Sequence, residues 1–123
     1  FQVKDIAGQK FLTTDGTVFD VKPTLHKNNL PHQFYVRKNE TGSFLANLVG
    51  STCMEKDVIL NNVEVPSSIG YGDYVKIEGV GAYTIALSPT FINYLSPIFS
   101  IKDNNVSIIR RRQNIDDVIS LYQ

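Results

Sequence analysis

The chain has 123 residues, of which 42% are hydrophobic and 20% charged, and this fits one small globular domain. Twelve basic and twelve acidic residues cancel, so we expect neither a nucleic acid nor a membrane surface as partner. One cysteine and two histidines argue against an internal disulfide and against a zinc site. With no long apolar stretch and no signal-peptide pattern, we expect a cytoplasmic protein. Its first residue is Phe1, which leaves open that it is a piece of a larger protein.

Most of the chain consists of short runs rich in Val, Ile, Phe, Tyr and Thr, separated by Gly, Asn, Asp and Pro. This pattern predicts a mostly β domain, a sandwich or barrel of about eight or nine strands. Two-residue turns are predicted at Asp15–Gly16 and Asn104–Asn105, and the second should join two strands. The predicted strands are Phe1–Asp5, Lys10–Thr14, Gln33–Lys38, Phe44–Val49, Asp57–Leu60, Asp73–Ile77, Ala82–Leu87, Ile98–Lys102 and Asn105–Arg110.

One C-terminal helix is predicted, over Asn114–Tyr122. Asn114 can cap its first turn, and Asp116 and Asp117 complement the positive end of the helix dipole. Apolar residues recur on one face at helical spacing, namely Ile115, Val118, Ile119 and Tyr122.

Cys53 is the main candidate for chemistry when the residues are considered alone. It lies in a loop after the predicted strand Phe44–Val49, where a thiol can act as a nucleophile or proton donor. The commoner role of a free cysteine is that of a small buried apolar residue. His26 and His32 are interpreted as solvated loop residues rather than a metal pair, and Arg110–Arg112 as a solvated edge rather than a phosphate site.

Three motifs follow one another along the chain: Gly50-Ser51-Thr52-Cys53 with Asp57, then Gly72-Asp73, then Gly81-Ala82-Tyr83. In this order and spacing the chain resembles the C-terminal β-domain of the fold-type III PLP-dependent amino-acid decarboxylases, the family of the ornithine, arginine and diaminopimelate decarboxylases. The arginines that precede the predicted C-terminal helix are also similar to the end of that domain.

The resemblance implies a two-domain carboxy-lyase that uses pyridoxal 5'-phosphate (PLP). A larger N-terminal (β/α)8 barrel carries the Schiff-base lysine in this family and lies outside residues 1–123, so we expect this chain alone to be inactive and not to hold PLP. The family's active site forms across a homodimer interface. The alternative is a stand-alone β-barrel binding or interaction module without catalysis.

The resemblance also implies roles for single residues. Cys53 matches the catalytic cysteine that reaches across the interface and protonates the carbon left after CO2 departs, and Tyr83 matches the tyrosine that binds the cofactor phosphate. We expect both to be at least partly exposed, on one face. Gly81 and Ala82 complete the cofactor-binding motif, no metal site is expected, and the residues assigned to the substrate are Met54, Glu55, Asp57 and Phe91.

Met54 departs from the family pattern, which has an acidic residue directly after the cysteine to bind the distal ammonium of the substrate. A thioether cannot neutralise an ammonium. Glu55 is displaced by one position and would point the other way on an extended segment. We therefore expect a substrate whose distal end is neutral, carboxylated or conjugated, as in the siderophore branch of the family.

Overall fold

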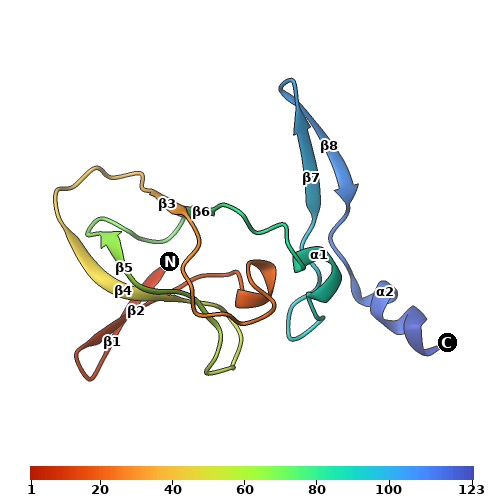
Figure 1. Ribbon diagram of the computed structural model, residues 1–123, viewed down its shortest axis with the longest axis horizontal. Coiled ribbons are helices and arrows are strands. Elements are labelled where there is room, and N and C mark those ends of the chain that lie inside the picture. Colours follow the sequence, from red (N-terminus) through yellow and green to blue (C-terminus); the bar gives the residue numbers. More distant parts are fainter. The chain divides into compact units, whose positions relative to one another are not determined.

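The computed structural model describes residues 1–123 and divides into two compact units, Phe1–Ser88 and Pro89–Gln123 (Figure 1). Its eight strands agree with the predicted number of about eight or nine. None of its helices has the length and apolar character needed to cross a membrane. The strands are β1 (Gln2–Ile6), β2 (Gln9–Thr13), β3 (His32–Tyr35), β4 (Ser43–Val49), β5 (Val58–Pro66), β6 (Tyr74–Ile77), β7 (Ile98–Lys102) and β8 (Asn105–Arg110). The helices are the α-helices α1 (Thr84–Leu87) and α2 (Ile115–Ile119) and the 3₁₀-helices η1 (Val18–Asp20) and η2 (Ser120–Tyr122).

The first unit is built on a four-stranded sheet in the order β1-β2-β4-β5, in which only the β2–β4 pair is parallel. Strands β3 and β6 form a separate antiparallel pair, and its apolar side chains pack against the core of the larger sheet. The prediction of a barrel is wrong, because β3 and β6 pair only with each other and the ladder does not close. The buried core consists of Leu12, Val18, Ala46, Leu48, Ile59, Leu60, Val63, Val65 and Ile69.

Strand β5 is longer than predicted. The predicted strand ends at Leu60, before two asparagines, but pairing with β4 continues to Pro66. Asn62 takes a left-handed backbone with φ 47°, and its amide donates to Asn47 Oδ1 at 2.7 Å beside an irregularity in the register. The two asparagines therefore form a bulge within the strand rather than its end.

The prediction of a strand over Ala82–Leu87 is wrong. Tyr83 has a left-handed backbone with φ 65°, and the helix α1 follows it directly. The amide of Leu87 donates to the carbonyl of Tyr83 at 2.8 Å, and the amide of Ser88 donates to that of Thr84 at 3.2 Å. Apolar and β-branched residues fit either element in so short a segment, and here the left-handed residue starts a helical turn.

The hairpin β7–β8 has the bounds that the sequence predicts. Its tight turn lies at Asp103–Asn104, where both residues have a positive φ, one position before the predicted turn. The other predicted turn, at Asp15–Gly16, does not close a hairpin, because β2 continues into η1 and pairs in parallel with β4.

Helix α2 begins as predicted, with Asn114 as its cap. Asn114 Oδ1 accepts from the Asp117 amide at 3.1 Å, and Asp117 Oδ2 accepts from the Asn114 amide at 2.9 Å, which forms a capping box. Arg111 holds the same carboxylate with two hydrogen bonds, at 2.7 and 2.5 Å. The Arg111 bonds and the Asn114 amide lower the pKa of Asp117 to about 2.

This lowered pKa predicts how the cap of α2 depends on pH. Because the pKa is lower in the folded chain than the ordinary 3.8, the carboxylate stabilises the helix above about pH 4, and this contribution is lost as the pH falls towards 2. NMR titration of the α2 amides should show this loss, and Asp117→Asn should abolish it. Asp116→Asn, in the same turn, is the control and should leave it in place. Titration of Asp117 near pH 4 would contradict the assignment.

Candidate functional site

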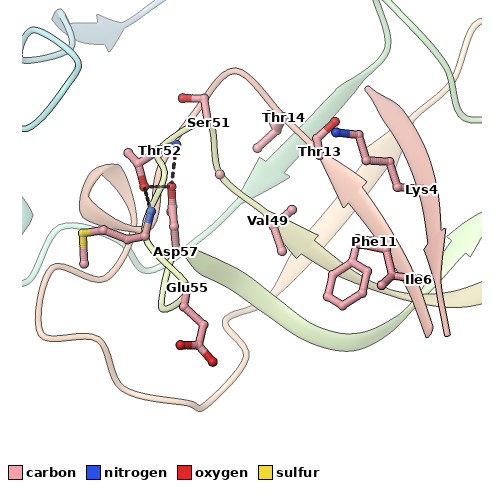
Figure 2. Close-up of a pocket in the computed structure, with 12 residues that line it drawn as sticks. Lys4, Ile6, Phe11, Thr13, Thr14, Val49, Ser51, Thr52, Glu55 and Asp57 are labelled. Atoms are coloured by element: carbon pink, nitrogen blue, oxygen red, sulfur yellow. Dashed lines mark hydrogen bonds between the residues drawn. The ribbon is translucent and has the colours of Figure 1, made fainter.

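Asp57 is the centre of a buried hydrogen-bond network at the start of β5. It is only 2% exposed, and both carboxylate oxygens accept from groups of the chain. Oδ1 accepts from the Val18 amide at 2.6 Å and the Thr17 hydroxyl at 3.2 Å. Oδ2 accepts from the Thr52 amide at 3.0 Å and the Thr52 hydroxyl at 2.5 Å, as Figure 2 shows. One carboxylate thus ties together two loops that are distant in sequence.

Gly50 is packed directly against this carboxylate. A Cβ atom at position 50 would lie 2.2 to 2.4 Å from the Asp57 carboxyl group, far inside van der Waals contact. The Gly50 amide also donates to the Asp57 carbonyl at 2.9 Å. With Asp57 in this position, only glycine fits at position 50, because any side chain there would overlap the carboxyl group.

Cys53 lies within this loop and is exposed, as the family resemblance implies, and does not take the buried role that is commoner for a free cysteine. The residues on both sides of Cys53 are held in place by hydrogen bonds. Thr52 donates twice to Asp57, and the Met54 carbonyl accepts from the Asp57 amide at 3.0 Å. The Ser51 amide donates to the Gly16 carbonyl at 2.9 Å. The loop presents a solvent-accessible thiol on a fixed backbone.

Beside the loop lies an open depression of about 540 Å³, and both Met54 and Glu55 line it. Its other side comes from β1, β2 and the end of β4, including Lys4 and Phe11. The expectation for Glu55 assumed an extended segment, but the segment is not extended, because a hydrogen bond from the Asp57 amide to the Met54 carbonyl closes a turn there. Met54 and Glu55 both line the depression.

Tyr83 is 67% exposed, as expected, and it precedes α1. Gly81 and Ala82 are exposed too, and a Cβ at Gly81 would meet no atom within 4 Å. Ser88, at the end of α1, donates to the Phe19 carbonyl at 2.6 Å. The third motif is therefore an exposed turn whose following helix is anchored to η1.

Helix η1 connects the Cys53 loop and the Tyr83 turn within the first unit. Its residue Val18 donates to Asp57, and its residue Phe19 accepts from Ser88. The hydroxyl of Thr17 caps η1 through the Phe19 amide at 3.4 Å while donating to Asp57. Sequence reasoning missed this segment, although Thr before a short apolar run is a helix-start signal.

In the second motif, Gly72-Asp73, the Asp73 carboxylate holds two segments of the chain together by hydrogen bonds. Asp73 accepts from the Gly70 amide at 2.8 Å, the Arg37 amide at 3.1 Å and the Arg37 guanidinium at 3.2 Å. The Arg37 amide is the main cause that lowers the pKa of Asp73. Gly72 has φ 83°, and a Cβ there would press on the guanidinium. These contacts join the end of β3 to the start of β6.

Phe91, the two histidines and the arginines are the remaining candidate residues. Phe91 is 38% exposed and belongs to the second unit. His26 is exposed, whereas His32 is half-buried at the start of β3 and packs edge-on against Phe34, so its expected place in a solvated loop is wrong. Among the arginines, Arg110 donates to the Ser96 carbonyl, in addition to the Arg111 pair with Asp117.

Comparison with known proteins shows the family to which the chain is similar. Residues 1–81 match the family described as pyridoxal-dependent decarboxylase, C-terminal sheet domain. Diaminopimelate decarboxylase of Corynebacterium efficiens is 27% identical over 97% of the chain, and that of Mycobacterium tuberculosis is 28% identical over 97%. The chain covers only 26% and 28% of these two relatives, about a quarter of their length.

Solved structures share the backbone of the chain. A crystal structure of a diaminopimelate decarboxylase matches with a TM-score of 0.85 at 20% identity, covering 98% of this chain and 32% of that one. The Helicobacter pylori diaminopimelate decarboxylase complexed with L-lysine matches with a TM-score of 0.81 at 20% identity, over 98% of this chain and 30% of that one. At these identities the likeness establishes the fold.

Proposed function

Because the chain belongs to the C-terminal sheet domain family of the pyridoxal-dependent decarboxylases, we propose that it is the C-terminal domain of a longer, PLP-dependent amino-acid decarboxylase. The observation that carries the proposal is the exposed Cys53, in a loop fixed on both sides by the buried Asp57. In the proposed protein, an N-terminal barrel domain supplies most of the cofactor contacts, and this domain of one subunit completes the site of the other.

The residues of this chain fit the tasks of binding a phosphate and moving a proton. When bound, PLP supplies the electron sink that allows the carboxylate to leave as CO2. Tyr83 has an exposed hydroxyl that can donate to a phosphate oxygen without adding charge, and Gly81 leaves open space beside it. Cys53 has an exposed thiol that can donate a proton to the substrate carbon. Asp57 positions that thiol and, being buried, is not proposed to contact substrate.

Two neighbouring residues decide the proposed substrate class. Met54 favours a distal end that is neutral, carboxylated or conjugated, because an ammonium desolvated against a thioether is costly. Glu55 lines the same depression and supplies a carboxylate that can pair with an ammonium. The matched relatives are named diaminopimelate decarboxylases. We therefore propose diaminopimelate, which carries both a carboxylate and an ammonium at its far end, as the first substrate to test.

Replacing Glu55 with glutamine in the full-length protein should lower kcat/KM for diaminopimelate about tenfold or more. A hydrogen bond to a charged group contributes about 1.5 to 3 kcal/mol, and about 1.4 kcal/mol corresponds to a factor of ten. Glu40→Gln, at an exposed glutamate outside the depression, is the matched control. If kcat/KM for diaminopimelate is unchanged in Glu55→Gln, Met54 rather than Glu55 sets the specificity. In that case kcat/KM for a citryl-type conjugate of diaminopropionate should exceed kcat/KM for diaminopimelate, ornithine and lysine.

Replacing Tyr83 with phenylalanine should weaken PLP retention by about 1 kcal/mol, a factor of about five in Kd, since one hydrogen bond to the phosphate is lost. Fluorescence titration of the cofactor-free full-length protein with PLP measures the change. Tyr71→Phe, at another exposed tyrosine, serves as the control. Equal PLP affinity in Tyr83→Phe and the wild type would remove Tyr83 from the cofactor site.

The alternative is a binding or interaction module in which Cys53 and Tyr83 have no catalytic task. The two proposals differ in the cofactor. A decarboxylase purified at full length shows the visible absorbance of PLP bound to a lysine, and this absorbance disappears on reduction with borohydride. A full-length protein that has no such absorbance, even after incubation with PLP, would favour the binding module.

A further inference from the structure

Helix α1, which follows Tyr83, is a single turn without a buried residue. Its apolar side chains Ile85 and Leu87 are 61% and 53% exposed. On the other side of Tyr83, an added Cβ at Gly79 or Gly81 would meet no atom within 4 Å. Because this turn buries so little apolar surface, its position in the first unit depends largely on hydrogen bonds.

Ser88 makes the hydrogen bond that joins this turn to η1. Its hydroxyl oxygen lies 2.6 Å from the Phe19 carbonyl oxygen and 2.5 Å from the Thr84 carbonyl oxygen, so one hydroxyl donates to both elements. Thr84 directly follows Tyr83, and its own hydroxyl donates to the Val80 carbonyl. Ser88 is half-buried, which partly excludes competing water from these bonds. It therefore ties the backbone next to Tyr83 to η1.

From η1 the connection continues to the Cys53 loop. The Val18 amide donates to Asp57 Oδ1 at 2.6 Å, and Thr17, which caps η1, donates to the same oxygen at 3.2 Å. The other carboxylate oxygen accepts from the amide and the hydroxyl of Thr52, the residue before Cys53 (Figure 2). Hydrogen bonds and the three-residue η1 thus link Ser88 to the backbone beside the thiol.

We propose that Ser88 is a positioning residue for the reaction: by holding η1, it fixes the Tyr83 turn and the Cys53 loop relative to each other within the chain. This rests on the proposed function, which assigns the cofactor phosphate to Tyr83 and the proton to Cys53. Ser88 bonds two carbonyl groups of its own chain and is not proposed to contact substrate or cofactor. Because a reacting group misplaced by about 1 Å can lose most of its effect on the rate, a change at Ser88 should reach the chemistry.

Replacing Ser88 with alanine in the full-length protein should lower kcat about fivefold at saturating PLP, with KM unchanged, and should raise the Kd for PLP by a similar factor. One hydrogen bond contributes about this much. Ser88→Thr keeps the hydroxyl and should restore both values. Ser68→Ala is the matched control and should leave them unchanged, because half-buried Ser68 donates to the Lys38 carbonyl at the same 2.6 Å. If Ser88→Ala does not fold, Ser88→Val is compared with Ser88→Thr, which has the same shape.

Combination with the two proposed site residues separates positioning from a general loss of stability. In a Cys53→Ala background, Ser88→Ala should no longer lower kcat. In a Tyr83→Phe background, it should no longer weaken PLP binding. Equal effects of Ser88→Ala in the wild type and in both backgrounds would show that it acts on stability alone. Values for Ser88→Ala that match those for Ser68→Ala would show that it has no such role. Either result would overturn the proposal.

Amide hydrogen exchange follows the connection without PLP and without turnover. In the cofactor-free full-length protein, exchange at the Val18 and Thr52 amides should be about fivefold faster in Ser88→Ala than in the wild type, and unchanged in Ser68→Ala. Unchanged exchange at both amides in Ser88→Ala would overturn the proposal even if kcat falls. A wild-type protein that binds no PLP would refute the proposed function, and with it the role of Ser88 in the reaction, while the exchange result still shows whether the connection exists.

Discussion

Replacing Cys53 with alanine in the full-length protein should lower kcat at least about tenfold with little change in KM. A positioned proton donor contributes on the order of a hundredfold or more to the rate, and alanine removes the donor without adding bulk. Because the loop backbone is held through Thr52 and Met54, the substitution should not move the neighbouring residues. Steady-state release of CO2 measures the effect.

Two controls separate loss of the thiol from damage to the loop. Lys56→Ala removes an exposed side chain of the same loop and should retain wild-type turnover. Cys53→Ser keeps the shape of the side chain but replaces the thiol by a much weaker acid, so it should be impaired like Cys53→Ala. Wild-type turnover in Cys53→Ala would withdraw the catalytic assignment and leave Cys53 as a surface residue.

Replacing Gly50 with alanine should destabilise the first unit by about 3 kcal/mol. The new methyl group would lie 2.2 to 2.4 Å from the Asp57 carboxyl group, so the carboxylate has to leave its site. The amide of Val18 and the hydroxyl and amide of Thr52 then lose their acceptor, and each buried unpaired group costs about 1 to 3 kcal/mol. Urea denaturation followed by tyrosine fluorescence measures this loss, since the chain contains no tryptophan.

The matched control is Gly16→Ala. A Cβ at Gly16 meets no atom within 4 Å, so the substitution should leave the free energy of unfolding unchanged within about 0.5 kcal/mol. A Gly50→Ala variant as stable as Gly16→Ala would contradict the packing of Gly50 on Asp57. Gly50→Ala should also impair turnover, because the displaced loop carries Cys53.

The strands were largely predictable because their signals are local. Alternating apolar residues between breakers give Ile98–Lys102 and Asn105–Arg110 with the observed bounds. Predictions failed where a local signal supports two structures. The asparagines after Leu60 are compatible with a strand end or with a bulge, and the segment after Gly81 is compatible with a strand or with a helical turn.

The candidate site was predictable only in part, for a physical reason. The exposure of Cys53 and Tyr83 was expected from the resemblance to the family, whereas the residues considered alone favoured a buried Cys53. The role of Asp57 was not expected, because its partner Thr17 lies 40 residues away and only tertiary structure brings them together. The depression that Met54 and Glu55 both line was not predicted, because it depends on a turn for which the sequence carries no recognisable signal.

Release of CO2 from diaminopimelate, measured in parallel for the full-length protein and for residues 1–123 alone, tests the central claim most directly. The account predicts that the full-length protein, loaded with PLP, releases CO2 in amounts stoichiometric with the amino acid consumed. Residues 1–123 alone should release none, because the chain supplies a proton donor and a phosphate contact but not the barrel domain. A PLP-loaded full-length protein that releases no CO2 from diaminopimelate, ornithine, lysine, arginine or a citryl-type diaminopropionate conjugate would contradict the account, as would CO2 release by residues 1–123 alone.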